Sequence, residues 1–539
     1  MIQLLALMTA ACDRWSPCQF LSRTVVPIFF AVTFLTTYSP FLSVCRAQSA
    51  PRPNIVLMLS DDMGWADPGF HGGDASLTPN MDRLAGESLR MTQFYAHSVC
   101  APTRAALMTG RYAFRNWMDW RSEDFGKPSY LNKLGMKLAQ NKRGEPTRML
   151  HGLPGEERTI AEVLQDAGYF TALVGKWHLG EWLHEQLPRG QGFDHQYGHY
   201  GWGIDYNNYT IPHNSPATFA VYDWHRNGKP VDEQGYSTDL FANEAVRLIS
   251  EQDADRPFFL YVPFNAIHGP LEDIPRYTDT LDKRSAALKC LDEAVGRIVN
   301  TIDQYGFSEN TLVIFANDNG GLTEEVNRPY RGTKNTTFEG GVRVPCLMRW
   351  PNQIAAGETS TAMMHVVDLL PTFASLSGGS TEGCATLDGM DFSDVLLKQT
   401  SSPRDEIVFE VSGSVRLPTI RSGRYKLMGE QLYDVIADPG ESTDVAKQHP
   451  DRVAKLKQRL DEFSKQRPPL SKIIGDPPIL MDPPQPYVYG QSENANAPEW
   501  LKRRVDAVRA TQPQSWPAGK TPWPQAPTGA TIIYEGDGR

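Results

Sequence analysis

Four short apolar runs, each followed by polar residues, restrict the fold of this 539-residue chain more than any other feature. They cover residues 54–60, 171–175, 258–262 and 311–316, and helical patterns at 159–167, 239–250 and 285–305 alternate with them. Continuous apolar runs of this length are typical of strands buried on both faces. Strand–helix alternation predicts an α/β fold, with a mostly parallel sheet between layers of helices.

The polar side chains that follow these four runs can bind ions or protons. In chain order they are Asp61 and Asp62, Lys176 and His178, His268, and Asp318 and Asn319. Taken singly, the acidic pairs suit turns or helix caps, and the basic residues suit a solvated surface or a buried core. In open α/β sheets, however, ligands bind beyond the carboxyl ends of the strands. We therefore expect all seven side chains to converge on one edge of the sheet.

The acidic and amide side chains of this set predict a metal site. Asp61, Asp62, Asp318 and Asn319 offer only oxygen ligands, which suit a hard cation such as Ca²⁺ or Mg²⁺. Without a cation, carboxylates gathered in one place repel each other and raise their own pKa values.

A second candidate site residue, Cys100, lies just before a predicted helix. Pro102 suits the first turn of that helix, and Gly110 suits its C-terminal cap. Cys100 would then lie at the helix N-terminus, where free N–H groups and the dipole lower the pKa of a thiol. The alternative is a small, buried and inert cysteine.

Two further segments suggest how basic side chains reach the same place. In an extended segment, Lys176 and His178 would point the same way, because they are two residues apart. Lys334 begins a segment that ends in Gly340 and Gly341, and paired glycines indicate a close approach of backbones.

The N-terminal segment predicts export. Arg23 precedes an apolar run over residues 25–44, and the small residues Ala47 and Ser49 suit a signal-peptidase cut. A membrane anchor is the alternative, because the run approaches the ~20 residues that span a bilayer. We expect a periplasmic or secreted protein. The net charge of −10 argues against a nucleic-acid partner, and it means that a polyanionic substrate would need a local basic pocket.

The C-terminal part has a different pattern. Short alternating segments at 406–411, 419–421, 425–428 and 431–433, followed by a helical pattern over 450–466, predict a small antiparallel sheet with one helix. From residue 467 onward, proline and polar residues dominate. The predicted organisation is therefore a leader (1–49), a catalytic domain (50–402), a C-terminal subdomain (403–466) and a proline-rich tail (467–539).

Six blocks of this sequence, in order, resemble the formylglycine-dependent type I sulfatases of the alkaline phosphatase superfamily. They are residues 61–65, 100–111, 175–180, 267–270, 318–320 and 334–341. The resemblance implies a sulfuric ester hydrolase with an alkaline-phosphatase-like mixed sheet. The chain departs from the family pattern at Thr103 and Asn317, where the family more often has serine.

In this family the signature cysteine is oxidised to formylglycine (3-oxoalanine) by a maturation enzyme. The resemblance assigns that role to Cys100, whose hydrate would attack sulfur and form a covalent sulfo-enzyme intermediate. It also implies Ca²⁺ or Mg²⁺, bound by an oxygen of modified Cys100 and by the four oxygen-bearing residues named above.

The remaining roles are implied in the same way. Arg104 would hold the formylglycine hydrate, and Lys176 and Lys334 would bind the sulfate oxygens. His178 would hydrogen-bond the hydrate and help to expel sulfate. His268 would contact the bridging oxygen and protonate the leaving alcohol.

The substrate is suggested by a finer resemblance. Residues 187–194 and 205–206 resemble the arylsulfatase B branch, which implies an N-acetylgalactosamine-4-sulfate unit of a sulfated carbohydrate. The aromatic-rich segment 202–236 either lines a sugar subsite or packs on itself.

Two other functions remain as alternatives. One is a phosphodiesterase or phosphonate monoester hydrolase of the same superfamily, because such enzymes share the metal site. The other is a metal-dependent glycan-binding protein in which Cys100 stays unmodified. Relative rates on sulfate and phosphate esters separate the first alternative from a sulfatase, and the chemical state of Cys100 separates the second.

Overall fold

The computed structural model describes residues 52–116, 118–119, 152–180, 184–210, 222–411, 416–468, 499–500 and 503–504. The predicted leader and nearly all of the predicted tail lie outside these residues. In the part of the chain that is described, no helix is both long enough and apolar enough to cross a bilayer.

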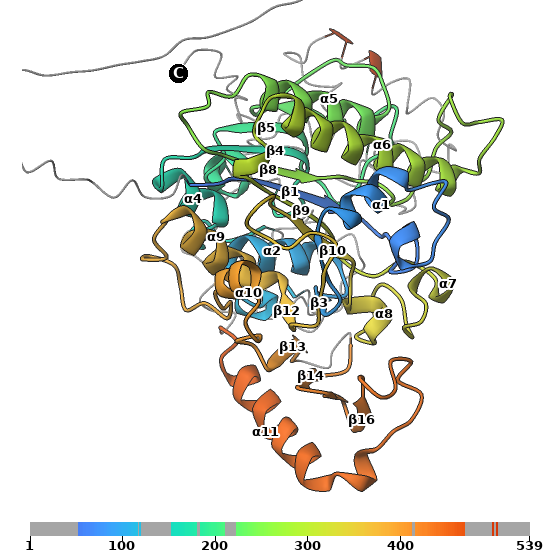
Figure 1. The fold of residues 1–539 in the computed structure, drawn as a ribbon, viewed down its shortest axis with the longest axis vertical. Helices are drawn as coiled ribbons and strands as arrows, with labels where there is room; N and C mark the ends of the chain where they lie inside the picture. The colour runs from blue at the N-terminus through green and yellow to red at the C-terminus, as the bar shows by residue number, and fades with distance from the viewer. Residues whose placement is uncertain are drawn as a thin grey trace, which may run out of the picture. The chain divides into compact units, whose positions relative to one another are not determined.

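The main sheet has ten strands in the order β11-β2-β10-β9-β1-β8-β4-β5-β6-β7 (Figure 1). The five parallel strands at its centre are β9 (Thr311–Asn317), β1 (Asn54–Ser60), β8 (Phe258–Pro263), β4 (Phe170–Lys176) and β5 (His195–His199). The flanking strands are β2 (Leu89–Met91), β10 (Cys346–Arg349), β11 (Thr359–Ser360), β6 (His225–Arg226) and β7 (Lys229–Pro230). Strand β10 is antiparallel to both of its neighbours, as is β6. The predicted α/β fold is confirmed, since all four apolar runs form strands of this sheet.

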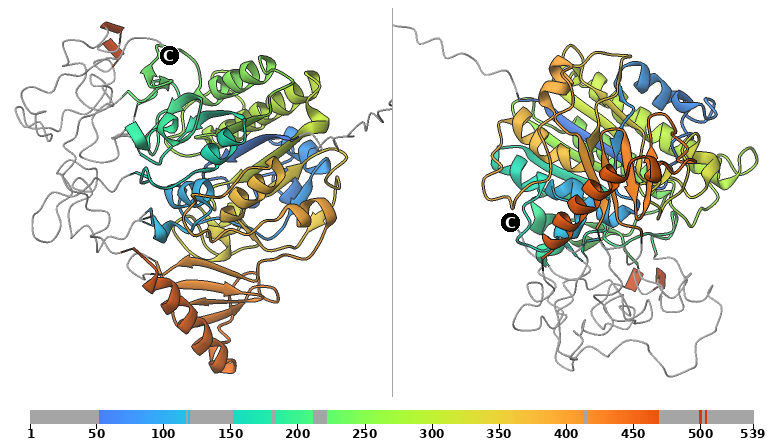
Figure 2. Two further views of the ribbon diagram at one scale, coloured as in Figure 1. Left: turned by 90° about the vertical axis from the view of Figure 1, so that its left-hand side faces the viewer. Right: turned by 90° about the horizontal axis from the view of Figure 1, so that it is seen from below.

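Helices cover both faces of the sheet, as the views in Figures 1 and 2 agree. One face carries α1 (Pro79–Gly86), α5 (Ser237–Ser250) and α6 (Lys283–Gln304); the other carries α2 (Cys100–Thr109), α4 (Ile160–Asp166) and α9 (Leu369–Ser377). The alternation of side chains along β1 serves both layers. Ile55, Leu57 and Leu59 pack into the core on the α2 side, whereas Val56 and Met58 pack on the α5 and α6 side. The sequence of a strand that is buried on both faces is therefore one continuous apolar run.

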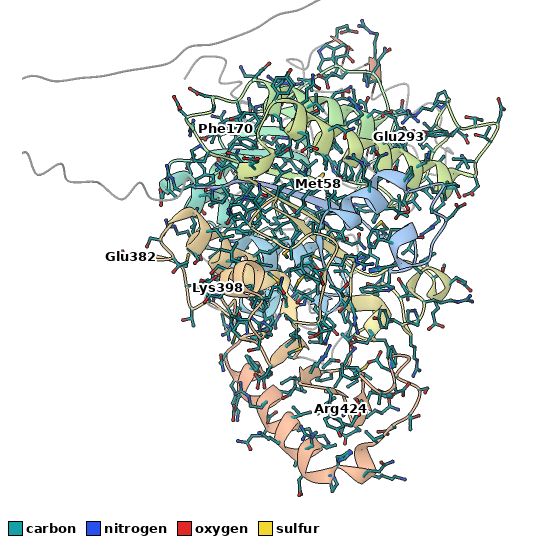
Figure 3. All side chains as sticks on the ribbon, viewed as in Figure 1. Met58, Phe170, Glu293, Glu382, Lys398 and Arg424 are labelled. Carbon is teal, nitrogen blue, oxygen red and sulfur yellow. The ribbon has the colours of Figure 1, made fainter. Side chains whose placement is uncertain are left out.

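Shorter elements complete the main domain. They are β3 (Phe94–Tyr95) paired with β12 (Met364–His365), and the helices α7 (Glu324–Asn327), α8 (Glu339–Val342) and α10 (Ser393–Lys398). Figure 3 shows the side chains on these elements and labels Met58 of β1, which packs in the core on the α5 and α6 side.

The C-terminal sheet is antiparallel and has four strands in sequence order. They are β13 (Glu406–Glu410), β14 (Thr419–Ser422), β15 (Tyr425–Met428) and β16 (Gln431–Asp434). Helix α11 (Pro450–Lys465) lies along this sheet, seen in orange in Figure 1. The predicted small sheet with one helix is confirmed.

Candidate active site

The candidate site lies at the carboxyl ends of the central parallel strands. Asp61 directly follows β1, Asp318 directly follows β9, and Lys176 is the last residue of β4. Strands β1 and β9 pair in register up to Ser60 and Asn317, so the two aspartates leave the sheet side by side. The expected convergence on one edge is therefore present.

Arg104 of α2 ties these strand ends together from inside the protein. Its Nη2 lies 2.7 Å from Oδ2 of Asp318 and 3.3 Å from Oδ2 of Asp61. Its Nη1 donates to the backbone oxygen of Lys176 at 2.9 Å, and the Nζ of Lys176 lies 2.6 Å from the same Oδ2 of Asp61. All four side chains are essentially fully buried.

A second group of contacts surrounds Asp62. The Nζ of Lys334 lies 2.6 Å from its Oδ1, and the side-chain amide of Asn319 donates to the same oxygen at 2.8 Å. The Nε2 of His268 lies 3.8 Å from Oδ2 of Asp62. Lys334 and His268 reach solvent, with 10% and 16% of their side chains exposed, and His178 is also partly exposed.

Three buried oxygens in this cluster have no hydrogen-bond partner among the described residues. They are Oδ1 of Asp61, Oδ1 of Asp318 and Oδ1 of Asn319. The sulfur of Cys100 and one carboxylate oxygen each of Asp61 and Asp318 all lie within 4.8 Å of one another. A buried carboxylate oxygen without a partner is costly. A hard divalent cation would satisfy all three oxygens, so the donor set fits the predicted metal.

The electrostatics of the two aspartates differ. Burial and the neighbouring Asp61 raise the pKa of Asp318 to about 7. Burial would also raise the pKa of Asp61, but Lys176, His268 and Arg104 together hold it well below its usual value. Repulsion between clustered carboxylates therefore appears at Asp318 but not at Asp61.

Both histidines of the site have lowered pKa values. Burial is the main cause at His178, reinforced by the positive charges of Lys176 and Arg104. Burial also lowers the pKa of His268, against the opposing effect of Asp61. Both shifts favour the neutral form of the imidazole.

The structure corrects two sequence-based expectations. Cys100 is the first residue of α2, as predicted, but burial raises the pKa of its thiol despite Lys176 and Lys334. The expected lowering was wrong because the helix terminus lies inside the protein. His178 has a φ of +58°, so the segment is not extended at this residue. His178 enters the electrostatic environment of Lys176 and Arg104 through a left-handed turn.

The aromatic-rich segment mostly packs on itself. The ring centroids of Tyr206 and Tyr236 are 4.7 Å apart, those of Tyr209 and Trp224 are 4.3 Å apart, and all four side chains are buried. Trp202 differs, because it is half-buried and its ring centroid lies 5.9 Å from that of His268. Residues 211–221 of this segment lie outside the described residues.

Several supporting residues escaped prediction. Asn317, noted only as a departure, accepts a hydrogen bond from the Ser60 hydroxyl at 2.7 Å and donates to the backbone oxygens of Met63 and Asn319. It therefore links the loops that carry the four oxygen-bearing residues. The Tyr206 hydroxyl donates to the backbone oxygen of His268 at 2.7 Å and fixes that loop. No local pattern marks either contact, because the partners are far apart in sequence.

Three local features noted in the sequence can be checked against the structure. The Thr103 hydroxyl accepts from the backbone N–H of His97 at 3.0 Å, a contact that a serine hydroxyl can also make. Helix α2 ends at Gly110 in the left-handed conformation, with a φ of 66°. A Cβ on Gly320 would lie 1.8 Å from the backbone oxygen of Gly340, which confirms the close backbone approach expected at the paired glycines.

Comparison with known proteins places this fold and site in a family. The chain matches the sulfatase family over residues 53–379, and the family described as N-sulphoglucosamine sulphohydrolase, C-terminal, over residues 333–466. It is 34% identical to N-acetylgalactosamine-6-sulfatase of Mus musculus over 404 residues, which covers 70% of this chain and 72% of that protein. It is 33% identical to arylsulfatase G of Rattus norvegicus over 441 residues, covering 72% and 78% of the two chains.

Solved structures agree with this placement. The chain matches Ps i-CgsB in complex with k-i-k-neocarrahexaose at a TM-score of 0.66 and 26% identity, covering 85% of this chain and 98% of that one. It matches PsFucS1 sulfatase from Pseudoalteromonas sp. at a TM-score of 0.61 and 26% identity, covering 78% and 92%. The chain therefore belongs to the sulfatase family. It is an enzyme of the sulfuric ester hydrolase class.

Proposed function

We propose that this sulfatase hydrolyses a sulfate ester of a sulfated carbohydrate, and that Cys100 works after oxidation to formylglycine. The observation that carries the proposal is the position of the Cys100 sulfur beside the Asp61 and Asp318 carboxylates, each of which has an unpartnered buried oxygen. Hydrated formylglycine supplies two hydroxyl groups, one to accept the sulfuryl group and one to expel it as sulfate.

Asp61, Asp62, Asp318 and Asn319 would hold the cation, together with an oxygen of the modified residue. When bound, Ca²⁺ or Mg²⁺ acts as a Lewis acid that stabilises negative charge on oxygen. The all-oxygen donor set supports this assignment, and it suits either cation.

The basic side chains around Cys100 have separable roles in the proposal. Lys334, which reaches solvent, and Lys176 supply fixed positive charge for the sulfate oxygens. Arg104 is fully buried between the carboxylates of Asp61 and Asp318, and it would orient the modified Cys100. His268 lies at the solvent-facing side of the site, where it would protonate the leaving alcohol.

A sulfated carbohydrate is supported by two observations. The relatives include an N-acetylgalactosamine-6-sulfatase, and one structural neighbour was solved with a neocarrahexaose. The half-buried Trp202 ring beside His268 is placed to meet a sugar face. The finer resemblance favours sulfate at position 4 of N-acetylgalactosamine, whereas these relatives are named for position 6.

Export and maturation belong to the same proposal. The apolar run over residues 25–44 with the small residues after it supports a cleaved leader, so we place the enzyme in the periplasm or outside the cell. N-terminal sequencing of exported protein tests this. The chain also needs a maturation enzyme to oxidise Cys100 before it can act.

The test is a rate measurement on N-acetylgalactosamine 4-sulfate, N-acetylgalactosamine 6-sulfate, an aryl sulfate and an aryl phosphodiester, together with mass spectrometry of the Cys100 peptide. We expect the highest kcat/KM on one of the sulfated sugars and an aldehyde or hydrate at Cys100. A higher rate on the phosphodiester would favour the phosphodiesterase alternative. An unmodified thiol in fully active enzyme would overturn the formylglycine assignment.

A further inference from the structure

Arg416 is a buried positive charge near the active site that the C-terminal subdomain contributes. It lies just before β14, and 10% of its side chain is exposed. Its Nη2 lies 3.4 Å from the side-chain oxygen of Asn335, the residue after Lys334. The backbone N–H of Asn335 donates to the backbone oxygen of Ser98 at 2.8 Å, two residues before Cys100. The guanidinium thus contacts the segment that carries Lys334, and that segment is hydrogen-bonded to the one that carries Cys100.

The hydrogen-bonding capacity of Arg416 is not filled by the described residues. Its Nε is buried and has no hydrogen-bond partner among them, and its Nη1 lies 3.8 Å from Oε2 of Glu410, too far for a hydrogen bond. Arg404 offers a contrast within the same part of the chain. Its Nε donates to Oδ2 of Asp368 at 2.8 Å, and its Nη1 donates to the Tyr112 hydroxyl and to the backbone oxygen of Glu406. A structural arginine is satisfied in this way, whereas Arg416 lacks such a set of partners in the part of the chain that the structure describes.

The charged groups that face Arg416 come from several elements. Burial lowers its pKa, while Glu410, Asp119 and the Cys100 thiol act in the opposite direction. Arg416 in turn contributes to the lowered pKa of His97, after burial. The Cys100 thiol and His97 are thus both close enough to Arg416 for its charge to affect them.

We propose that Arg416 is a substrate-recognition residue that binds an anionic group, a carboxylate or a second sulfate, close to the scissile sulfate ester. The preferred substrate would then be a sugar chain with at least two negative groups near each other. The planar fork of donors in arginine matches both carboxylate and sulfate. A local positive site of this kind would also offset the net charge of −10, which repels a polyanionic substrate at long range.

This inference rests on the proposed function, and the experiment separates the two. The kcat/KM of wild type, Arg416→Met and Arg416→Lys is measured on three kinds of sulfated N-acetylgalactosamine disaccharide. One has a neutral neighbouring sugar, one has a uronic acid, and one carries a second sulfate. An aryl sulfate serves as the reference. Arg424→Gln is the matched control, because Arg424 is half-exposed on the same small sheet and pairs with Asp434.

We expect wild type to prefer an acidic disaccharide over the neutral one. Arg416→Met should lose about 10- to 100-fold in kcat/KM on the acidic substrate, relative to its change on the aryl sulfate, with most of the loss in KM. Arg416→Lys should retain part of the preference, and Arg424→Gln all of it. Preference for the uronic acid or for the second sulfate identifies which anion is bound.

An equal loss on the acidic disaccharides and on the aryl sulfate would overturn the inference and make Arg416 structural. If Arg416→Met does not fold, the salt dependence of KM in wild type decides whether Arg416 binds an anion of the substrate. A steeper slope for the acidic substrate supports the inference, and equal slopes overturn it. Activity on sulfate esters without any acidic preference would overturn the inference alone. Inactivity on every sulfate ester would overturn the proposed function as well.

Discussion

Two buried clusters of charged residues in this protein use the same kinds of side chain and differ in how completely these are paired. The first, the rim cluster, consists of Asp61, Asp62, Arg104, Lys176, Asp318, Asn319 and Lys334 at the edge of the main sheet. The second, the Glu339 cluster, consists of Tyr95, Glu339, Arg343, Arg421, Lys426 and Glu441, where the main domain meets the C-terminal sheet.

In the Glu339 cluster, both carboxylate oxygens of Glu339 have partners. Lys426 lies 3.0 Å from Oε1, and the Tyr95 hydroxyl donates to Oε2 at 2.7 Å. Glu441 accepts from the backbone N–H of Glu339 at 2.6 Å, and its Oε1 lies 2.9 Å from Nζ of Lys426 in an ion pair that lacks hydrogen-bond geometry. In the rim cluster, by contrast, one oxygen each of Asp61, Asp318 and Asn319 has neither a hydrogen bond nor an ion pair with any residue that the structure describes. Equal burial thus accompanies two degrees of pairing, which suit a structural role for the Glu339 cluster and the proposed metal-binding role for the rim cluster.

The largest expected effect concerns Cys100, the proposed nucleophile beside the rim cluster. Cys100→Ser lacks the second hydroxyl that formylglycine provides, so we expect turnover to fall by about 10⁴-fold or more. Binding of sulfate esters and thermal stability should stay near those of wild type, because the two side chains are close in size. Steady-state assays with matched thermal unfolding check this. Full turnover by the variant would contradict the proposed role of Cys100.

The corresponding change in the Glu339 cluster should affect stability instead. Glu339→Ala leaves Lys426 buried without its main partner, so we expect the free energy of unfolding to fall by about 3–5 kcal/mol. Urea unfolding measures this. Activity per folded molecule should persist at temperatures well below the transition. A selective loss of activity without destabilisation would erase the distinction between the clusters.

Removing a proposed ligand tests the open positions directly. Asp318→Asn should lower kcat by about 10²–10³-fold, as for the loss of one electrostatic contact to the transition state. Ca²⁺ at 100 times its Kd should stabilise wild type by about 2.7 kcal/mol but should stabilise this variant much less. Thermal unfolding with and without Ca²⁺ after chelation gives the comparison. Equal stabilisation of both proteins would remove Asp318 from the metal site.

The smallest expected effect concerns pH. Burial alone would raise the pKa of Glu339, but Lys426, Arg421 and Arg343 lower it to about 2. A folded-state pKa below the unfolded value means that Glu339 contributes stability above about pH 4.5, which is lost as pH falls toward 2. The stability gap between wild type and Glu339→Gln should therefore narrow over that range in unfolding experiments. A stability gap that widens on acidification would show that folding raises the pKa of Glu339 and does not lower it.

The comparison also explains which features the sequence could predict. Strands β1, β4, β8 and β9 were predictable because a strand buried on both faces has a continuous apolar sequence. The shared location of the polar residues after them was predictable because parallel strands end at the same edge of the sheet. The Glu339 cluster was not predictable, because Lys426 and Glu339 are 87 residues apart. The same holds for Arg416 and Asn335, which are 81 residues apart.

Local conformation and burial set the other limits. The sequence shows that a helix begins just before Pro102, but it does not show how deeply that helix terminus is buried. The predicted direction of the pKa shift at Cys100 was therefore wrong. The left-handed conformation of His178, whose backbone N–H donates to the backbone oxygen of Tyr200, is marked by no local pattern. Similarly, composition alone could not separate the buried rings of Tyr206 and Trp224 from the half-buried Trp202.

The burial of α2 has a consequence for timing. All ten of its residues are buried, and only 4% of Cys100 is exposed. A modifying enzyme must bring this thiol into its own active site, which the folded chain does not allow. If Cys100 is oxidised as proposed, the oxidation has to take place before the chain folds, while the segment around Cys100 is still extended. A chain that folds first would be stable and well packed, but its buried thiol would be inaccessible to the modifying enzyme and the protein would stay inactive.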